Sequence, residues 1–326
     1  MSKYRNHLPQ LDNDLFITDG GMETTLIFHE GWELRDFAAF DLLNHPAGRQ
    51  SIQNYYRTYI DLAKTYAVGL ILESATWRAN SDWGTKLGYH RQALAEANRQ
   101  AIALLQDLRQ KQESPTTPLV ISGCVGPRGD GYNAAYRMSE AGAERYHRPQ
   151  IATFAETAAD LVTAMTINYV EEAIGIVRAA QAYGMPVVIS FTVETDGRLP
   201  SGQSLQTAIE QVDQATQQGP LYYMINCAHP SHFASSLTAG TFVKRIRGIR
   251  ANASKKSHAE LDEATVLDDG NPADLGSHYQ TLRKQFPHVN VLGGCCGTDH
   301  RHIEAICQAC LPLVWPYFTQ RPLLSA

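Results

Sequence analysis

Eight short apolar segments, rich in β-branched residues, recur along the chain and are separated by longer stretches of mixed polarity. Most of these segments are almost continuously hydrophobic rather than alternating, which is typical of parallel strands covered on both faces. The seventh segment is basic and meets this criterion only weakly. The predicted strands span residues 15–21, 69–74, 119–126, 161–166, 186–193, 221–228, 244–253 and 289–297.

The stretches between these segments have the spacing of amphipathic helices. In the first of them, Ile52, Tyr55, Tyr56 and Tyr59 fall on one helical face. Residues 125–150 are rich in Gly, Tyr and Arg, and we expect a long loop there, on the face where the strands end. The pattern predicts helices over residues 51–67, 90–110, 153–162, 171–184, 204–219, 273–285 and 299–314.

Strands that are each followed by a helix predict an α/β fold of the (β/α)8 TIM barrel type. An open doubly wound sheet is the competing fold, but no GxGxxG motif follows the first predicted strand. No low-complexity linker divides the chain. We therefore expect a single domain over residues 1–326, with its core over about 15–312.

The overall composition argues against several other classes of protein. The chain has 326 residues, 44% of them hydrophobic, and its formal net charge of -5 argues against a nucleic-acid-binding surface. It shows neither a signal-peptide core nor an apolar run long enough for a membrane span, so we expect a cytoplasmic protein without membrane partners. The sequence leaves open whether the protein is a monomer or a homo-oligomer.

Three of the six cysteines stand at the ends of predicted strands. Cys227 ends the sixth strand, and Cys295 and Cys296 end the eighth, so their thiols can converge over the mouth of a barrel. Three thiolates at one point repel one another unless a cation holds them, and Zn²⁺ favours sulfur in tetrahedral geometry. Gly293 and Gly294 permit the close backbone approach that lets two successive side chains face one ion. Three protein ligands leave a fourth position open, as in catalytic zinc sites.

The charge of such a centre indicates its chemistry. Zn²⁺ with three thiolates carries a net charge of about -1 by formal sum, so it is a weaker Lewis acid than zinc bound by neutral histidines. It still lowers the pKa of an incoming thiol and holds it as a nucleophilic thiolate. Alkyl transfer to a thiol is therefore the predicted reaction.

The remaining cysteines fit structural roles better. Cys124 lies inside a predicted strand, and Cys307 and Cys310 lie in the last predicted helix, so core packing is the preferred interpretation of all three. A redox protein with a Cys295–Cys296 disulfide is the least favoured hypothesis, because adjacent cysteines bridge only with strain and Cys227 would have no role.

Several motifs together resemble the zinc-dependent homocysteine S-methyltransferase family. This family includes S-methylmethionine- and betaine-dependent enzymes and the homocysteine domain of cobalamin-dependent methionine synthase. The motifs are TDGGMETTL, LILESATWRAN, SGCVGPRGD, VVISFTVETDGRLPSGQSL, INC and GGCCGT. The resemblance implies a (β/α)8 barrel with zinc on Cys227, Cys295 and Cys296, and a substrate thiol as the fourth ligand.

The same resemblance implies an activity and substrate-binding residues. The implied reaction moves a methyl group from an onium donor (S-methylmethionine, S-adenosylmethionine or betaine) to homocysteine, giving methionine, so we expect a role in methionine biosynthesis. Trp77, with Trp83 and Trp32, is a candidate for the donor site because cations favour aromatic faces, unless these rings cover the barrel mouth or an oligomer contact. The implied substrate-binding positions are Asp19, Gly20, Gly21, Glu73, Thr166 and Asn226.

One departure from the family concerns the substrate. Family members usually carry a Glu-Thr pair at the end of strand four, and that glutamate holds the amino group of homocysteine. Here the pair is Met165-Thr166, and a thioether cannot pair with an ammonium. The change weakens homocysteine binding by about 1.5–3 kcal/mol unless another acid compensates. The alternatives are a different thiol substrate, or a barrel that binds a thiol or a metal without catalysis.

Two smaller departures follow. His300 stands where the family often has Pro, and we expect a variation of the helix start. The basic segment GIRANASKK (248–256) either meets an anionic part of a substrate or is simply solvated.

Overall fold

The computed structural model describes residues 2–237, 240–264 and 266–314. Over these residues, eight parallel strands pair in sequence order and close into a barrel, because the eighth strand pairs with the first. This confirms the predicted single-domain (β/α)8 barrel, including the weak seventh strand. The strands are β1 (Phe16–Ile17), β2 (Gly69–Glu73), β3 (Leu119–Val125), β4 (Leu161–Ile167), β5 (Val187–Phe191), β6 (Tyr223–Asn226), β7 (Ile246–Ala251) and β8 (Val291–Gly294).

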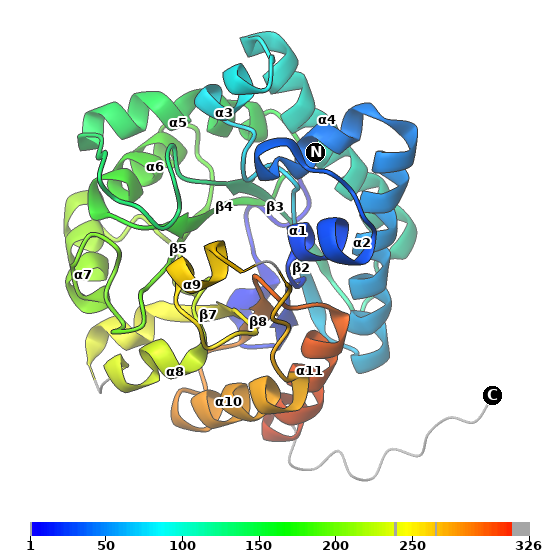
Figure 1. Cartoon of the computed structure of the whole chain (residues 1–326), viewed down its shortest axis with the longest axis vertical. Helices are drawn as coiled ribbons and strands as arrows, with labels where there is room; N and C mark the ends of the chain where they lie inside the picture. Colours follow the sequence, from blue (N-terminus) through cyan, green and yellow to red (C-terminus); the bar gives the residue numbers. More distant parts are fainter. Residues whose placement is uncertain (1, 238–239, 265, 315–326) are drawn as a thin grey trace.

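The helices form an outer ring around the strands (Figure 1). The longer ones are α2 (Pro46–Tyr66), α4 (Arg91–Gln112), α5 (Glu140–Ala155), α6 (Val170–Ala182), α7 (Leu205–Thr216), α10 (Pro272–Gln285) and α11 (His300–Val314). The shorter ones are α1 (Met22–Thr24), α3 (Ser81–Lys86), α8 (Pro230–Phe233) and α9 (His258–Asp262). Short turns of other helix types are η1 (Pro9–Asp12), η2 (Thr25–His29), η3 (Arg35–Phe37), η4 (Ala39–Asn44), η5 (Ala234–Ser236) and η6 (Thr241–Arg245).

Both faces of the strands are buried, which explains why their sequences are almost continuously apolar. The outward faces pack against the helices in the larger core. The inward faces form a second, smaller core at the end of the barrel where the strands begin. That core consists of Leu8, Phe16, Ile71, Val120, Leu161, Val188, Tyr222, Met224 and Val291.

The segment before β1 closes this end of the barrel. Leu8 is buried in the inner core, and η1 follows it directly. The Gln10 carbonyl accepts hydrogen bonds from Asn290 Nδ2 and Arg247 Nη1, each at 2.8 Å. These contacts join the N-terminal segment to the beginnings of β7 and β8.

One predicted helix is misplaced, and the expected loop is shorter. Helix α5 occupies part of the range 125–150, whereas residues 153–162 hold only its end, a turn and the first residues of β4. Ser139 begins α5 by accepting the Gly142 N–H at 3.2 Å. The helical pattern was obscured because Gly142 and Pro149 are weak helix formers.

No helix among the described residues has both the length and the apolar composition that crossing a membrane requires.

Candidate metal and substrate site

A cavity of about 560 Å³ lies at the end of the barrel where the strands finish. This is the face on which (β/α)8 barrels carry their active sites. Apart from Trp32 and Trp83, the site residues predicted from the sequence all line this one cavity. They are Asp19, Gly20, Gly21, Glu73, Trp77, Thr166, Asn226, Cys227, Cys295 and Cys296.

The three predicted metal ligands form a compact sulfur cluster. Their Sγ atoms all lie within 4.8 Å of one another. Cys227 and Cys295 are joined as a disulfide between the ends of β6 and β8, and Cys296 Sγ lies 4.0 Å from Cys227 Sγ. The joined pair is thus not the adjacent Cys295–Cys296 pair of the redox hypothesis. In the reduced state, the same three sulfur atoms are a donor set that suits Zn²⁺.

Cys227 is positioned by a polar network behind it. Thr166 and Cys227 both have left-handed backbone conformations, with φ of 61° and 54°, which non-glycine residues adopt only when their surroundings fix them. Asn226 supplies that constraint, because it exchanges two hydrogen bonds with Thr166 and its Oδ1 also accepts from Ser190 Oγ at 2.6 Å. Asn226 Nδ2 lies 4.0 Å from Cys295 Sγ, so it also faces the sulfur cluster.

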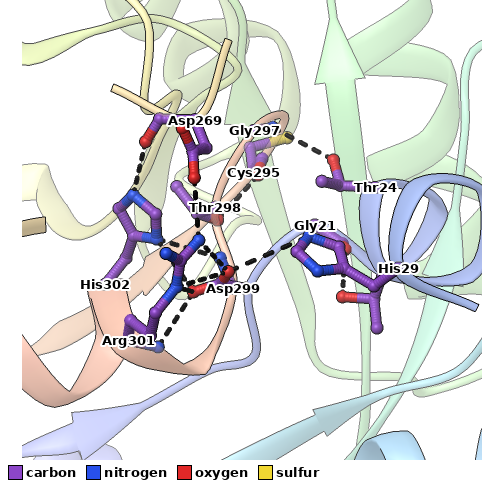
Figure 2. Close-up of polar contacts among 11 residues, drawn as sticks. Gly21, Thr24, His29, Asp269, Cys295, Gly297, Thr298, Asp299, Arg301 and His302 are labelled. Carbon is purple, nitrogen blue, oxygen red and sulfur yellow. Dashed lines mark hydrogen bonds and ion pairs between the residues drawn. The ribbon is translucent and has the colours of Figure 1, made fainter. Parts of the chain in front are cut away.

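The turn that carries Cys295 and Cys296 is tied to the loop after β1 (Figure 2). Gly21 donates its N–H to the Thr298 carbonyl, and Thr24 Oγ1 accepts the Gly297 N–H, both at 3.0 Å. Thr298 Oγ1 donates to the Cys295 carbonyl at 2.7 Å. These bonds fix the path of the backbone on both sides of the two cysteines.

A charged network holds the other side of this turn (Figure 2). Asp299 accepts hydrogen bonds from Arg301, and Arg301 also pairs with Asp269 at 2.8 Å. His302 Nδ1 lies 3.1 Å from Asp299 Oδ1. Burial alone would raise the pKa of Asp299, but the hydrogen bonds from His302 and Arg301 outweigh it and hold that pKa well below its ordinary value. Asp299 therefore anchors the start of α11 as a carboxylate.

A buried charge cluster lies in the cavity beside the sulfur atoms. Arg250 Nη2 lies 2.7 Å from Asp19 Oδ1, and Tyr55 OH donates to Asp19 Oδ2 at 2.9 Å. Glu73 is 5% exposed, and within the described part of the chain its Oε2 has no hydrogen-bond partner. Desolvation by burial raises the pKa of Glu73 to about 7, against the opposing effect of Arg250. Glu73 is thus a carboxyl group that a cationic ligand would ionise.

Met165, which replaces the family's glutamate, is buried and lines the cavity. Its carbonyl oxygen accepts a hydrogen bond from Trp77 Nε1 at 3.3 Å. The departure expected from the sequence therefore falls inside the candidate substrate site. Glu73, which the sequence predicts as a substrate-binding residue, is an acid that lines the same cavity.

The tryptophans are arranged differently from a simple cation cage. The Arg78 guanidinium lies over the rings of Trp77 and Trp83, at 4.3 and 3.6 Å from their centroids. Trp32 donates its Nε1–H to Ser51 Oγ at 3.0 Å. Of the three tryptophans, Trp77 lines the cavity and the other two do not. An onium donor would therefore meet a Trp77 ring that already contacts an internal cation.

Several cavity residues were not singled out from the sequence. They are Arg78, Tyr132, Arg250, Asn252 and His258, and the rings of Tyr132 and His258 stack at 4.0 Å. The basic segment gave a partial signal for Arg250. Arg250 fits the interpretation that the segment meets a substrate, because it lines the cavity and is only 8% exposed. Lys255 and Lys256 fit the solvated interpretation, because their side chains are 60% and 50% exposed.

The other sequence features behave mostly as expected. Cys307 and Cys310 are fully buried in the larger core, which confirms their packing role. Cys124 is also buried but lines the cavity. His300 is the first residue of α11, as the expected variation of the helix start requires.

Comparisons with known proteins point to one family. A family model described as Homocysteine S-methyltransferase matches residues 16–310. Homocysteine S-methyltransferase YbgG of Bacillus subtilis is 25% identical over 311 residues, which cover 90% of this chain and 93% of that protein.

Two solved structures have the same fold. The metallated form of the homocysteine methyltransferase MmuM from Escherichia coli matches with a TM-score of 0.70 and 19% identity, covering 94% of this chain and 99% of that one. Its oxidized form also matches with a TM-score of 0.70, at 18% identity, covering 93% of this chain and 99% of that one.

Proposed function

The chain belongs to the homocysteine S-methyltransferase family and is a methyltransferase, and we propose that it methylates the sulfur of homocysteine at a zinc site formed by Cys227, Cys295 and Cys296. The methyl donor is an onium compound of the S-methylmethionine, S-adenosylmethionine or betaine type, and the product is methionine. The observation that carries this proposal is the convergence of three sulfur atoms on a cavity that also holds a buried carboxyl oxygen, Glu73 Oε2, without a hydrogen-bond partner among the described residues.

The donor set fits a metal once the disulfide is reduced. Three cysteine sulfurs within 4.8 Å suit Zn²⁺ and leave one position for a substrate thiol. When bound, zinc would supply the positive charge that lowers the pKa of that thiol. A reducing compartment keeps the three cysteines available as ligands, which supports placing the protein in the cytoplasm, where it would serve methionine synthesis.

The protein's own groups would orient the substrate thiol. Asn226 and Thr166 hold the backbone of Cys227, and the backbone at Gly20 and Gly21 borders the cavity. We assign the ammonium of homocysteine to Glu73, because its Oε2 is buried and has no hydrogen-bond partner in the part of the chain that the structure describes. Glu73 then takes over the role that Met165 cannot perform.

The acidic rim of the cavity supports a cationic donor. Glu23, Asp130 and Asp268 line the cavity together with Arg78. A cavity with excess negative charge concentrates cations, so an onium donor is favoured over an anionic one. Trp77 contributes an apolar surface to the same cavity.

The test is a matrix of acceptor thiols and methyl donors assayed with reduced, zinc-reconstituted protein. Homocysteine, cysteine and 3-mercaptopropionate are each combined with S-methylmethionine, S-adenosylmethionine and betaine, and zinc content is measured on the same sample. Zinc-dependent conversion of isotopically labelled homocysteine to labelled methionine is the expected result; the label is needed because S-methylmethionine itself becomes methionine when it loses its methyl group. Methylation of another thiol alone would identify a different acceptor, which Met165 motivates. Binding of zinc and thiol without turnover in any combination would show a non-catalytic barrel.

A further inference from the structure

Arg250 occupies a central position in the substrate cavity. It lies at the end of β7, and its guanidinium reaches across to the ends of β8 and β1. Its Nε donates to the Gly294 carbonyl at 3.0 Å, and its Nη2 donates to the Gly20 carbonyl at 3.2 Å. Gly294 directly precedes Cys295, so Arg250 links the backbone of the sulfur cluster to the first strand end.

The hydrogen bonds of Arg250 leave part of the guanidinium unused. A guanidinium has five N–H groups. The Nε–H and the two Nη2–H groups face Gly294, Gly20 and Asp19. Among the described residues, Nη1 makes no hydrogen bond, although Arg250 lines the cavity. A nitrogen with two unused hydrogens in a mostly buried site is suited to a carboxylate ligand.

Asp19 contacts two neighbouring side chains. Arg250 faces its Oδ1, and Tyr55 donates to its Oδ2. The contact with Arg250 is an ion pair, and among the described residues Asp19 Oδ1 accepts no hydrogen bond. Asp19 thus holds Arg250 in place through this ion pair.

We propose that Arg250 binds the carboxylate of the acceptor through Nη1, so that the enzyme selects thiols that carry a carboxyl group. The proposal rests on the proposed function, which puts the acceptor's sulfur at the cysteine cluster and its ammonium at Glu73. Glu73 and Arg250 then bracket the two charges of an α-amino acid. Recognition by two opposite charges in one buried cavity replaces recognition by the glutamate that Met165 has displaced.

The experiment compares homocysteine with 3-aminopropane-1-thiol, which is homocysteine without its carboxyl group. With the native protein, loss of the carboxylate should raise KM by about 10- to 150-fold, the range expected for a charge-assisted hydrogen bond. In the double variant Arg250→Gln/Asp19→Asn, the two thiols should differ by less than about threefold. The same KM ratio of the two thiols in the native protein and in the double variant would overturn the proposal.

The choice of variants separates recognition from folding. Arg250→Gln alone leaves Asp19 buried without its counter-ion, which is strongly destabilising, whereas the double variant keeps the charge balanced. Arg250→Lys keeps the positive charge but loses the forked guanidinium. In this variant, the rise in KM on loss of the substrate carboxylate should be intermediate. Arg247→Gln is the matched control on the same strand. Arg247 binds Gln10 and Asn13 at the opposite end of the barrel, and its removal should leave the native penalty unchanged.

A binding measurement distinguishes failure of this inference from failure of the proposed function. Calorimetry with methionine and methionine methyl ester tests carboxylate recognition without any methyl transfer. Equal affinities of the native protein for these two probes overturn the role of Arg250, whatever the assay shows. If the native protein binds the ester about tenfold more weakly than methionine, and the double variant shows no such difference, the role of Arg250 is supported. This holds even if no thiol is methylated, in which case the proposed function alone fails.

Discussion

Asn226 and Thr166 exchange two hydrogen bonds between the ends of β6 and β4. The Thr166 N–H donates to Asn226 Oδ1 at 3.0 Å, and Asn226 Nδ2 donates to Thr166 Oγ1 at 2.8 Å. Cys227 follows Asn226 directly, so this exchange sets the position of the first sulfur of the cluster. The pair joins two strand ends that are separated in the barrel by β5.

Removing this amide should weaken both the fold and the metal site. Asn226→Ala leaves the buried Thr166 N–H unpaired, which costs about 1–3 kcal/mol. Zinc affinity should fall by about 10- to 100-fold, as for other groups that orient metal ligands. Urea unfolding and zinc titration measure the two effects. Ser190→Ala is the control, because it removes one bond to Asn226 and leaves the exchange with Thr166 intact. Unchanged zinc affinity in Asn226→Ala would contradict this role.

Removing a sulfur should abolish metal binding and methyl transfer together. Cys296→Ala leaves two sulfur atoms in the cluster, too few for a stable tetrahedral site. Bound zinc, measured by elemental analysis after reduction, should fall to background, and so should turnover. Cys310→Ala, in the larger core, should keep both. Full activity in metal-free Cys296→Ala would refute the zinc mechanism.

Gly297 should be required for the geometry of the two adjacent cysteines. It has a φ of 78°, and a Cβ there would lie 2.6 Å from the Asp268 carbonyl oxygen. Gly297→Ala should therefore lower zinc affinity at least about tenfold, because it shifts the turn that carries the ligands. Gly88→Ala is the matched control, since Gly88 has a φ of 88° but no atom of the described residues within 4 Å of the added Cβ. Both variants should lose about 1–2 kcal/mol of stability, because alanine is strained in the left-handed conformation. Only Gly297→Ala should lower the zinc affinity.

Glu73 should make homocysteine binding depend on pH. Its pKa is raised to about 7, chiefly by desolvation, and only the ionised carboxylate pairs with an ammonium. KM for homocysteine should therefore fall as pH rises through about 7. Glu73→Gln should have a higher KM without this step, even though the charged neighbours Asp19 and Arg250 remain.

The same group has a measurable effect on stability. Between its ordinary pKa of 4.5 and about 7, folded Glu73 keeps a proton that the unfolded chain has lost. The free energy of unfolding should therefore decrease as pH rises across this range, by roughly 3 kcal/mol in total. Urea titrations of the native protein and Glu73→Gln at several pH values check the sign. A native protein that loses no more stability than the variant over this range would show that Glu73 is not desolvated.

Periodicity alone was enough to predict the barrel, because parallel strands buried on both faces leave a plain hydrophobic signal. Even β7, interrupted by Arg247 and Arg250, was identified. The start of α5 was missed since Gly142 and Pro149 weaken its helical signal. At the start of α5, tertiary packing and the capping residue Ser139 decide the structure.

The sulfur cluster was predictable because cysteines at strand ends must meet over a barrel mouth. The role of Arg250 was not, since its partners Asp19 and Gly20 belong to the opposite end of the sequence. A basic residue in a strand looks the same whether it points to solvent or into a cavity. Only closure of the barrel, with β1 beside β8, distinguishes the two cases.

That closure also sets an order in time. Phe16 pairs with Val291, and Asn290 donates to the Gln10 carbonyl 280 positions away. A ribosome must therefore deliver β8 before β1 can complete its pairing, and contacts this distant in sequence form late in folding. Cys295 and Cys296 emerge immediately after the strand that closes the ring. The nascent chain thus exposes Cys227 before its two partner sulfurs exist, and the complete site can first form only after β8 and the two residues that follow it have been synthesised.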